Sequence, residues 1–236
     1  MTYNIHHAGG MDEKVDLERV ARVIRASNPD FVALQEVDKG AKRTGGVDQP
    51  GELARLTNMH VVYGPAMPYQ GGQYGDAVLT RWPVASSRVV ELPWRQGGQR
   101  EPRIAVAATT NLPGKAGPIE FISTHWDHTH EPSDRLTQAE KVNKTWHGAG
   151  PTTILAGDFN CAPSSAPLEA VMREWSIVTG TDPAELTCCG NSLHEKIDHV
   201  FVKPSKRWRV IEHHVVEEDM ASDHRPVVVK LELRPK

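Results

Sequence analysis

Apolar residues recur at helical spacing near the start of the chain. Val20, Val23 and Ile24 would share one helix face, and Pro29 follows them as a helix stop. This pattern predicts an amphipathic helix over Asp16–Ser27. Weaker patterns of the same kind predict helices at Gly51–Asn58, Pro132–Trp146 and Pro167–Trp175.

Short apolar runs between turns rich in Gly and Pro predict strands along the rest of the chain. These strands outnumber the helices, and many would pair as hairpins. This favours an α/β (α+β) fold of two packed sheets with helices outside over a doubly wound parallel sheet. No repeat or linker interrupts the pattern, so we expect one domain over residues 1–236. The predicted strands are Thr2–Ile5, Phe31–Leu34, Ala77–Leu79, Ser87–Leu92, Ile104–Thr110, Ile119–Thr124, Thr152–Ala156, Ile197–Val202, Val210–Val216 and Pro226–Leu233.

The 236 residues have an ordinary globular composition, with 39% hydrophobic and 24% charged residues. This composition excludes collagen-like, coiled-coil and wholly disordered chains. No apolar run approaches the roughly 20 residues that span a bilayer, so we expect no transmembrane segment. The net charge of −3 gives no strong basic surface for nucleic acid.

Three cysteines, Cys161, Cys188 and Cys189, show neither a disulfide framework nor zinc-site spacing. This favours a reducing compartment or a chain without redox chemistry. No signal peptide is visible, so a soluble cytoplasmic protein is the default expectation. A periplasmic or secreted protein whose leader has been removed stays open.

Polar residues repeatedly stand just past or beside the ends of the predicted strands. Each of these residues alone is common in a turn, but together they would form one rim of carboxylates, amides and imidazoles. The chain also has a surplus of histidines, 12 in all, which often marks a functional site. Hard oxygen donors of this kind suit Mg²⁺, Mn²⁺ or Ca²⁺ rather than a thiolate zinc site. The rim residues are Asn4, Glu36, His125, Asp127, Asp158, Asn160, Asp198, Asp223 and His224.

The order of these motifs resembles the endonuclease/exonuclease/phosphatase (DNase I-like) superfamily, and within it a compact bacterial branch similar to sphingomyelinase-like phosphodiesterases. The resemblance runs from residue 2 to residue 227. It implies a four-layer α/β/β/α sandwich with the site at one edge of both sheets. The matching segments are Thr2–His7, Leu34–Val37, Tyr74–Arg81, Ser123–Asp127, Gly157–Asn160, Ile197–His199 and Ser222–Val227.

The resemblance also implies a metal site and a phosphate site. Glu36 would be the principal ligand of Mg²⁺, with Mn²⁺ or Ca²⁺ as alternatives, supported by Asn4 and Asp223. Asp158 and Asn160 would face the scissile phosphate and the attacking water, or a second metal ion. Whether one or two ions bind stays open.

Two imidazoles complete the expected catalytic set. His224, oriented by Asp198, would act on the phosphate or as the base, and His125 would contact the phosphate. A carboxylate or an imidazole can deprotonate an in-line water, so Asp158 and His224 both remain candidates for the general base.

Four residues are expected on the substrate side of the site. His6 lies two residues after Asn4, on the same strand face. Asp76 stands where this branch commonly has Asn, so its carboxylate would add negative charge near the substrate or lie harmlessly at the surface. The expected substrate-binding residues are His6, Asp76, Arg103 and Asp127.

These features predict a monomeric, divalent-metal-dependent phosphoesterase that hydrolyses a small or lipid-headgroup phosphodiester. The chain is short for the fold and leaves little room for insertions that clasp DNA. A nonspecific endonuclease or exonuclease is the alternative within the enzyme class. A catalytically inactive binding module is disfavoured because the catalytic and metal positions are all occupied by the expected residue types.

Overall fold

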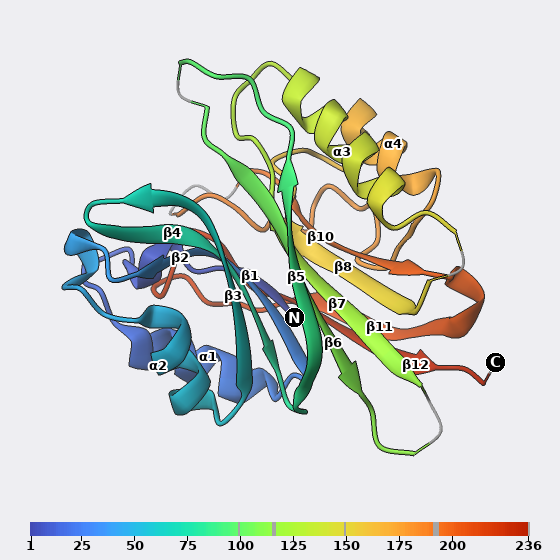
Figure 1. Cartoon of the computed structure of the whole chain (residues 1–236), viewed down its shortest axis with the longest axis horizontal. Coiled ribbons are helices and arrows are strands. Elements are labelled where there is room, and N and C mark those ends of the chain that lie inside the picture. The colour runs from blue at the N-terminus through green and yellow to red at the C-terminus, as the bar shows by residue number, and fades with distance from the viewer. Residues whose placement is uncertain (99, 115–116, 149, 191–193, 236) are drawn as a thin grey trace.

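Side chains of β2 (Phe31–Lys39) alternate between two apolar layers. Val32 and Leu34 pack among helix residues, whereas Phe31 and Ala33 pack against strands of another sheet. Successive strand side chains point to opposite faces, so a strand apolar on both faces lies inside a layered structure. The computed structural model describes residues 1–98, 100–114, 117–148, 150–190 and 194–235 and shows these layers directly (Figure 1).

The strands form two six-stranded mixed sheets. In the first, β1 and β2 are parallel, and in the second β7 and β8 are parallel, while the other paired neighbours are antiparallel. The first sheet has the order β11 (Trp208–Val215), β12 (Val227–Leu233), β1 (Thr2–Asn4), β2, β4 (Gly72–Thr80), β3 (His60–Tyr69). The second has the order β5 (Val84–Leu92), β6 (Arg103–Asn111), β7 (Pro118–His125), β8 (Thr152–Asp158), β10 (Asp198–Lys203), β9 (Ser176–Ile177).

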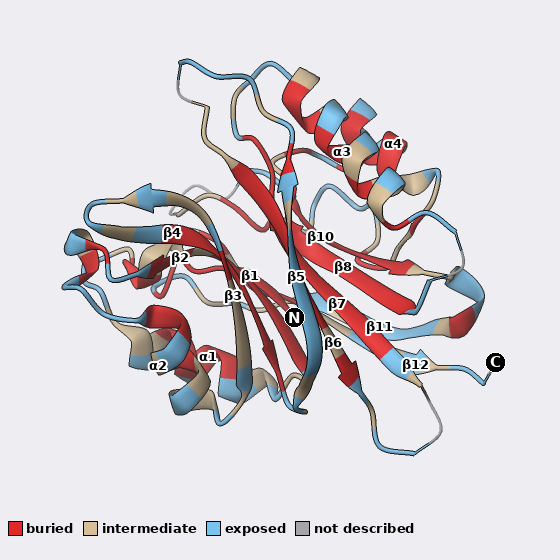
Figure 2. Cartoon of the chain, in the orientation of Figure 1, coloured by how far each residue is buried: buried red, intermediate tan, exposed pale blue. Residues whose placement is uncertain are grey.

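Helices cover the outer face of each sheet. The Asp16 side chain caps the first helix by accepting a hydrogen bond from the Arg19 N–H at 2.9 Å. Figure 2 shows the buried helix positions on the sides that face the sheets. In the described residues, no helix is long and apolar enough to cross a membrane. Helices α1 (Leu17–Ser27) and α2 (Gln49–Thr57) cover the first sheet, and α3 (Ser133–Thr145) and α4 (Ala166–Met172) cover the second.

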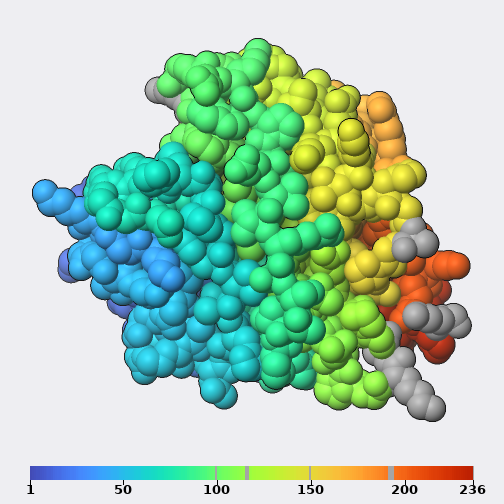
Figure 3. Space-filling model, in the orientation of Figure 1, coloured from blue at the N-terminus to red at the C-terminus, as the bar shows by residue number. Residues whose placement is uncertain are grey.

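Three apolar layers therefore alternate with the four layers of secondary structure. One lies under α1 and α2, one under α3 and α4, and one between the sheets. In the middle layer the rings of Phe31 and Phe121 stack with centroids 5.0 Å apart. The four-layer sandwich predicted from the sequence is confirmed. In the space-filling view, the blue and cyan N-terminal part of the chain lies beside the green and yellow part that follows it (Figure 3).

Strand direction brings the polar strand ends to one edge. The parallel pairs β1–β2 and β7–β8 end there, while β10, β12 and β4 run antiparallel to their neighbours and begin near it. The register pairs His125 with Asp158, and Asp158 with Asp198. Residues far apart in sequence thus meet at one rim of the sandwich.

Strand β3 was not predicted from the sequence. It contains Pro65 and Pro68, which usually argue against a strand because proline cannot donate a backbone hydrogen bond. The strand lies at the sheet edge and has an irregularity between Pro65 and Met67, where proline is tolerated. The other predicted elements are present with shifted ends; β5, for example, begins at Val84 rather than Ser87.

Gly157 allows β7 and β8 to approach beside the rim. A Cβ atom at this position would lie 2.0 Å from the carbonyl oxygen of Thr124. We expect Gly157→Ala to lower the free energy of unfolding by about 3 kcal/mol, because the backbone must move. Urea unfolding measures this change, with Gly150→Ala, whose Cβ would meet nothing within 4 Å, as the control. A Gly157→Ala protein as stable as the control would contradict the prediction.

Candidate active site

The Asn4 side chain joins the two sheets at the rim. Its amide nitrogen donates to Glu36 Oε1 at 3.2 Å and to Asp158 Oδ2 at 3.1 Å. Its amide oxygen accepts the backbone N–H of His6 at 3.1 Å. The sequence suggested a metal ligand here, but the amide nitrogen faces the carboxylates and the oxygen is already paired. The geometry therefore gives Asn4 the role of positioning two carboxylates.

Glu36 reaches the site because β2 contains a bulge. Gln35 and Glu36 together stand opposite Asp76 of β4, and Glu36 has a φ of 59°. A bulge of this kind breaks the alternation of side chains and redirects one of them. The carboxylate of Asp76 accepts the backbone N–H of Glu36, and burial raises the pKa of Asp76 well above its ordinary value. Asp76 thus lies buried behind Glu36 rather than at the surface.

His224 lies between two buried carboxylates. Its Nδ1 is 2.9 Å from Asp198 Oδ2, and its Nε2 is 3.6 Å from Asp158 Oδ2. Burial lowers the pKa of His224, but the negative charges of Asp198 and Asp158 outweigh it and raise the pKa to about 10. His224 is therefore an imidazolium at neutral pH. This is the orientation by Asp198 that the sequence predicted.

The pKa of Asp158 is raised as well, but in a carboxyl group this shift favours the neutral form. Burial, followed by the charge of Asp198, raises the pKa of the Asp158 carboxyl to about 7. The backbone N–H of Asn160 donates to Asp158 Oδ1 at 2.9 Å, and the Asn160 amide nitrogen donates to the Trp126 carbonyl at 3.0 Å. The turn that follows β8 is thereby fixed, and Asn160 faces the same cavity as Asp158.

His125 is the second imidazole at this place. Its Nε2 lies 3.5 Å from Asp158 Oδ2. Burial, and then the positive charges of Arg103 and His224, lower the pKa of His125 well below its ordinary value. His125 is therefore neutral and can donate one N–H to an anion.

The segment after β1 brings further imidazoles toward Glu36. His6 and His7 offer ring nitrogens that lie with a Glu36 oxygen within 4.8 Å of one another. His6 Nδ1 is also 3.9 Å from Asp223 Oδ1. Asp223 lines the same cavity as Glu36. Its role as a metal ligand remains a prediction. The adjacent His7 was not among the predicted site residues, although the His-His pair after Asn-Ile was a usable signal.

The structure separates the remaining substrate-side predictions. Arg103 is buried, lines the cavity and has its Nη2 3.0 Å from His128 Nδ1. Asp127 does not join the site. Its Oδ2 accepts the Thr129 N–H at 3.1 Å, and its own N–H donates to Gln138 at 3.0 Å, so it belongs to the turn that precedes α3. Asp127 is not among the described residues that line the cavity, so its contact with substrate stays a prediction without support from this geometry.

A cavity of about 310 Å³ opens beside these groups. Its outer wall includes side chains that the sequence reading did not assign to the site. Arg43 makes two hydrogen bonds to Asp38, at 2.7 and 2.9 Å, and its guanidinium lies 4.5 Å from the centre of the Tyr69 ring. Tyr74 begins the matched segment Tyr74–Arg81, and this position could have identified it as a site residue. The turn that carries Arg43 offered no such signal. Other unassigned lining residues are Tyr69, His128, Cys188, Cys189 and Glu195.

Cys188 and Cys189 form a disulfide bond in the cavity wall. The sequence pattern had argued against disulfides because it offers no framework of separated cysteines. A bond between adjacent residues needs no such framework, which is why the spacing rule missed it. Cys161 is buried, and burial raises the pKa of its thiol to about 12.

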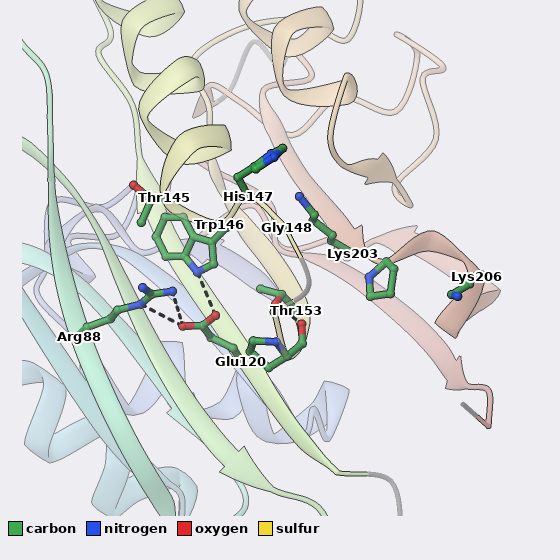
Figure 4. Close-up of a pocket in the computed structure, with 12 residues that line it drawn as sticks. Arg88, Glu120, Thr145, Trp146, His147, Gly148, Thr153, Lys203 and Lys206 are labelled. Carbon is green, nitrogen blue, oxygen red and sulfur yellow. Dashed lines mark hydrogen bonds and ion pairs between the residues drawn. The ribbon is translucent and has the colours of Figure 1, made fainter.

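A second cavity, of about 380 Å³, lies at the opposite end of β7 and β8 (Figure 4). Arg88 Nη2 pairs with Glu120 Oε1 at 2.8 Å, and Trp146 Nε1 donates to Glu120 Oε2 at 2.9 Å. The ion pair and the hydrogen bond thus hold these three side chains together in the cavity wall. The perturbed carboxylates and imidazoles gather instead at the rim near Asn4, which is the stronger candidate for chemistry.

The link between Asp198 and His224 yields a prediction about proton binding. Asp198→Asn removes the negative charge next to Nδ1, so we expect the pKa of His224 to fall from about 10 toward the neutral range. Titration of the His224 ring by NMR in the full-length, metal-free protein measures this fall. Asp127→Asn, which removes a buried carboxylate outside the site, is the control. An unchanged His224 titration in Asp198→Asn would refute the assignment.

Comparison with known proteins agrees with this geometry. A sequence model of the endonuclease/exonuclease/phosphatase family matches residues 1–224. A protein of this family from Beutenbergia cavernae DSM 12333 has a similar structure, with a TM-score of 0.80 and 27% identity over 99% of this chain and 70% of that chain.

Two more distant structures show the same fold. An endonuclease/exonuclease/phosphatase family protein from Leptotrichia buccalis C-1013-b has a TM-score of 0.78 and 19% identity, covering 98% of both chains. A mannosyl-6-phosphatase from Bacteroides thetaiotaomicron VPI-5482 has a TM-score of 0.75 and 20% identity, again covering 98% of both chains. The chain therefore belongs to the endonuclease/exonuclease/phosphatase family of hydrolases and has its DNase I-like fold.

Proposed function

We propose that this protein is a Mg²⁺- or Mn²⁺-dependent phosphoesterase that hydrolyses a small or lipid-headgroup phosphodiester by attack of water. One observation carries the proposal. Glu36 of β2, Asp158 of β8 and His224, in the segment before β12, meet around the Asn4 amide at the wall of one cavity. Paired carboxylates beside a charged imidazole are suited to phosphoryl transfer to water.

The donor set fits a hard divalent cation. Glu36 and Asp223 present carboxylates to the cavity, and Asp158 and Asp198 are buried nearby with ligand atoms within 4.8 Å of His224. Burial, followed by the charge of Asp198, raises the pKa of Asp158, and a bound cation would favour its ionised form. We assign Glu36 as the principal ligand and Asp223 as its partner, while Asn4 positions Glu36. A bound cation would polarise a phosphoryl oxygen and favour attack at phosphorus.

The perturbed pKa values support different roles for His224 and Asp158 in the proposed reaction. An imidazolium has no free lone pair, so His224 is suited to contact a phosphoryl oxygen through Nε2–H. The Asp158 carboxylate is then the better acceptor for the proton of the attacking water. Asp198 keeps His224 oriented and charged, and neutral His125 donates a further N–H to the phosphate.

The cavity supports a compact substrate. Its volume of about 310 Å³ suits the headgroup of a small ester, and residues of the β3–β4 hairpin, including Met67 and Tyr69, form part of its wall. Fold alone does not select a substrate within this family. A nuclease activity is therefore an outcome that the substrate experiment below distinguishes, not a second proposal.

Replacement of the principal ligand tests the metal assignment. Glu36→Gln keeps the size of the side chain but removes its charge, so we expect kcat on bis-p-nitrophenyl phosphate with Mg²⁺ to fall by about 10³-fold. A chelator should abolish wild-type turnover, and added Mg²⁺ or Mn²⁺ should restore it. Glu91→Gln, on an exposed part of β5, should retain full activity. Equal rates in Glu36→Gln and Glu91→Gln would show that the metal site is placed wrongly.

A panel of substrates tests the substrate class. We expect kcat/KM to be higher for small phosphodiesters, or for a choline- or sugar-phosphate headgroup ester, than for plasmid DNA under the same Mg²⁺ concentration. The size of the cavity is the physical reason. Efficient plasmid nicking with no turnover of small diesters would replace the proposal with the nuclease alternative.

A further inference from the structure

Two sulfur atoms lie next to the proposed catalytic imidazole. Cys188 Sγ, Cys189 Sγ and a ring nitrogen of His224 all lie within 4.8 Å of one another. Cys188 and His224 are buried, Cys189 is half-buried, and all three line the cavity of about 310 Å³. The sulfurs are therefore close to His224 and reachable from solvent through the same opening as a substrate.

Backbone pairing holds the cysteines in this place. Cys188 forms a β-bridge with His224 and another with Glu195. The Gly190 N–H donates to the Asp223 carbonyl at 2.7 Å, and the Arg225 N–H donates to the Thr187 carbonyl at 2.7 Å. These hydrogen bonds flank the dipeptide on both sides, so its position beside His224 does not depend on the sulfur–sulfur bond alone.

We propose that Cys188 and Cys189, in their reduced form, bind one Zn²⁺ ion together with His224. Two thiolates and an imidazole form a donor set that zinc prefers, whereas the oxygen donors around Glu36 suit harder cations. Donors of one tetrahedral zinc ion lie roughly 3.5 to 4 Å apart. Reduction lets the two sulfurs move apart from bonding distance to that spacing, and the His224 nitrogen already lies within 4.8 Å of both.

The two sulfurs become available to zinc when the disulfide is reduced. A small dithiol gives two electrons and two protons to the Cys188–Cys189 bond, which breaks into two thiols while the dithiol closes to its own disulfide. Zinc then replaces the two thiol protons and the proton on the binding nitrogen of His224, and all three protons are released to solvent. Glu195, which lines the cavity and has a carboxylate oxygen near Cys189, can supply a fourth ligand in place of water.

Zinc at this site would engage the imidazole that the proposed reaction uses. A His224 nitrogen bound to zinc no longer carries the proton that contacts a phosphoryl oxygen. The reduced protein is therefore a zinc-inhibited form, and the disulfide form is resistant to zinc. This inhibitory consequence rests on the proposed function, whereas the binding of zinc does not.

Binding is tested on the full-length protein with Zn²⁺ and with Co²⁺ as a spectroscopic probe. The protein is reduced with a dithiol, and the dithiol is removed under anaerobic conditions. The reduced protein is then titrated with Zn²⁺ or Co²⁺ in excess Mg²⁺. We expect one zinc equivalent and a thiolate-to-cobalt charge-transfer band in the reduced wild type, and neither in the disulfide form. Cys189→Ser should weaken zinc binding by about 10²-fold or more. Cys161→Ser, which changes a buried thiol outside the cavity, should bind like the wild type.

Activity measurements separate the two proposals. Zinc should inhibit the reduced wild type but not reduced Cys189→Ser, with the rate of each enzyme compared with its own rate before zinc is added. A protein that binds zinc through its thiols but hydrolyses no phosphoester would refute the proposed function alone. Equal zinc affinity in reduced wild type and Cys189→Ser, or a cobalt complex without a thiolate band, would overturn the zinc site.

Discussion

The Asn4 amide nitrogen is the point on which the site depends, because it hydrogen-bonds a carboxylate from each sheet. Glu36 belongs to the first sheet and Asp158 to the second, and Asn4 donates to both. A second bridge lies just inside the first, where Gln35 Nε2 donates to Ser123 Oγ at 3.0 Å. Buried polar groups are costly when unpaired, so these bridges favour one relative placement of the sheets. The carboxylate proposed to bind the metal and the carboxylate proposed to act at the phosphate are thereby held in register.

Charge at the rim is organised around a buried excess of carboxylates. Asp158 and Asp198 lie close to each other, and the cationic His224 between them offsets part of the repulsion. The remaining negative charge makes the rim a favourable place for a divalent cation. Neutral His125, on the other side of Asp158, adds a hydrogen-bond donor without adding charge. Groups of the same residue type thus acquire different protonation states from their surroundings.

The sequence predicted the strand ends that carry chemistry better than it predicted side-chain direction. Apolar runs located the strands before Glu36 and Asp158. The excess of strands over helices favoured two packed sheets, and the family resemblance implied the four layers. Asp127 was predicted on the substrate side, but its position after a strand says nothing about the local turn that takes up its carboxylate. Asn4 was predicted near the metal, but which end of its amide faces the carboxylates is decided by contacts distant in sequence.

Other features were hidden for different physical reasons. An edge position made the prolines of β3 acceptable, and edge position is a property of the whole sheet. Arg43 enters the cavity wall through its pairing with Asp38 and Tyr69, which no short motif encodes. The Cys188–Cys189 bond also lies outside rules that are based on separated cysteines. Contacts between residues distant in sequence, rather than local propensity, determined the placement of β3 and of Arg43.

The apolar layer between the sheets changes in composition along the strands. Next to the catalytic edge it contains the small side chains of Ala33 and Ala156, whereas farther along it contains the rings of Phe31 and Phe121. The larger groups border a cavity of about 470 Å³ at the far edge. Small side chains permit a close approach of the sheets beside Glu36 and Asp158, the two carboxylates that Asn4 bridges. Residue volume inside the sandwich thus contributes to the spacing of the two carboxylates proposed to act on the substrate.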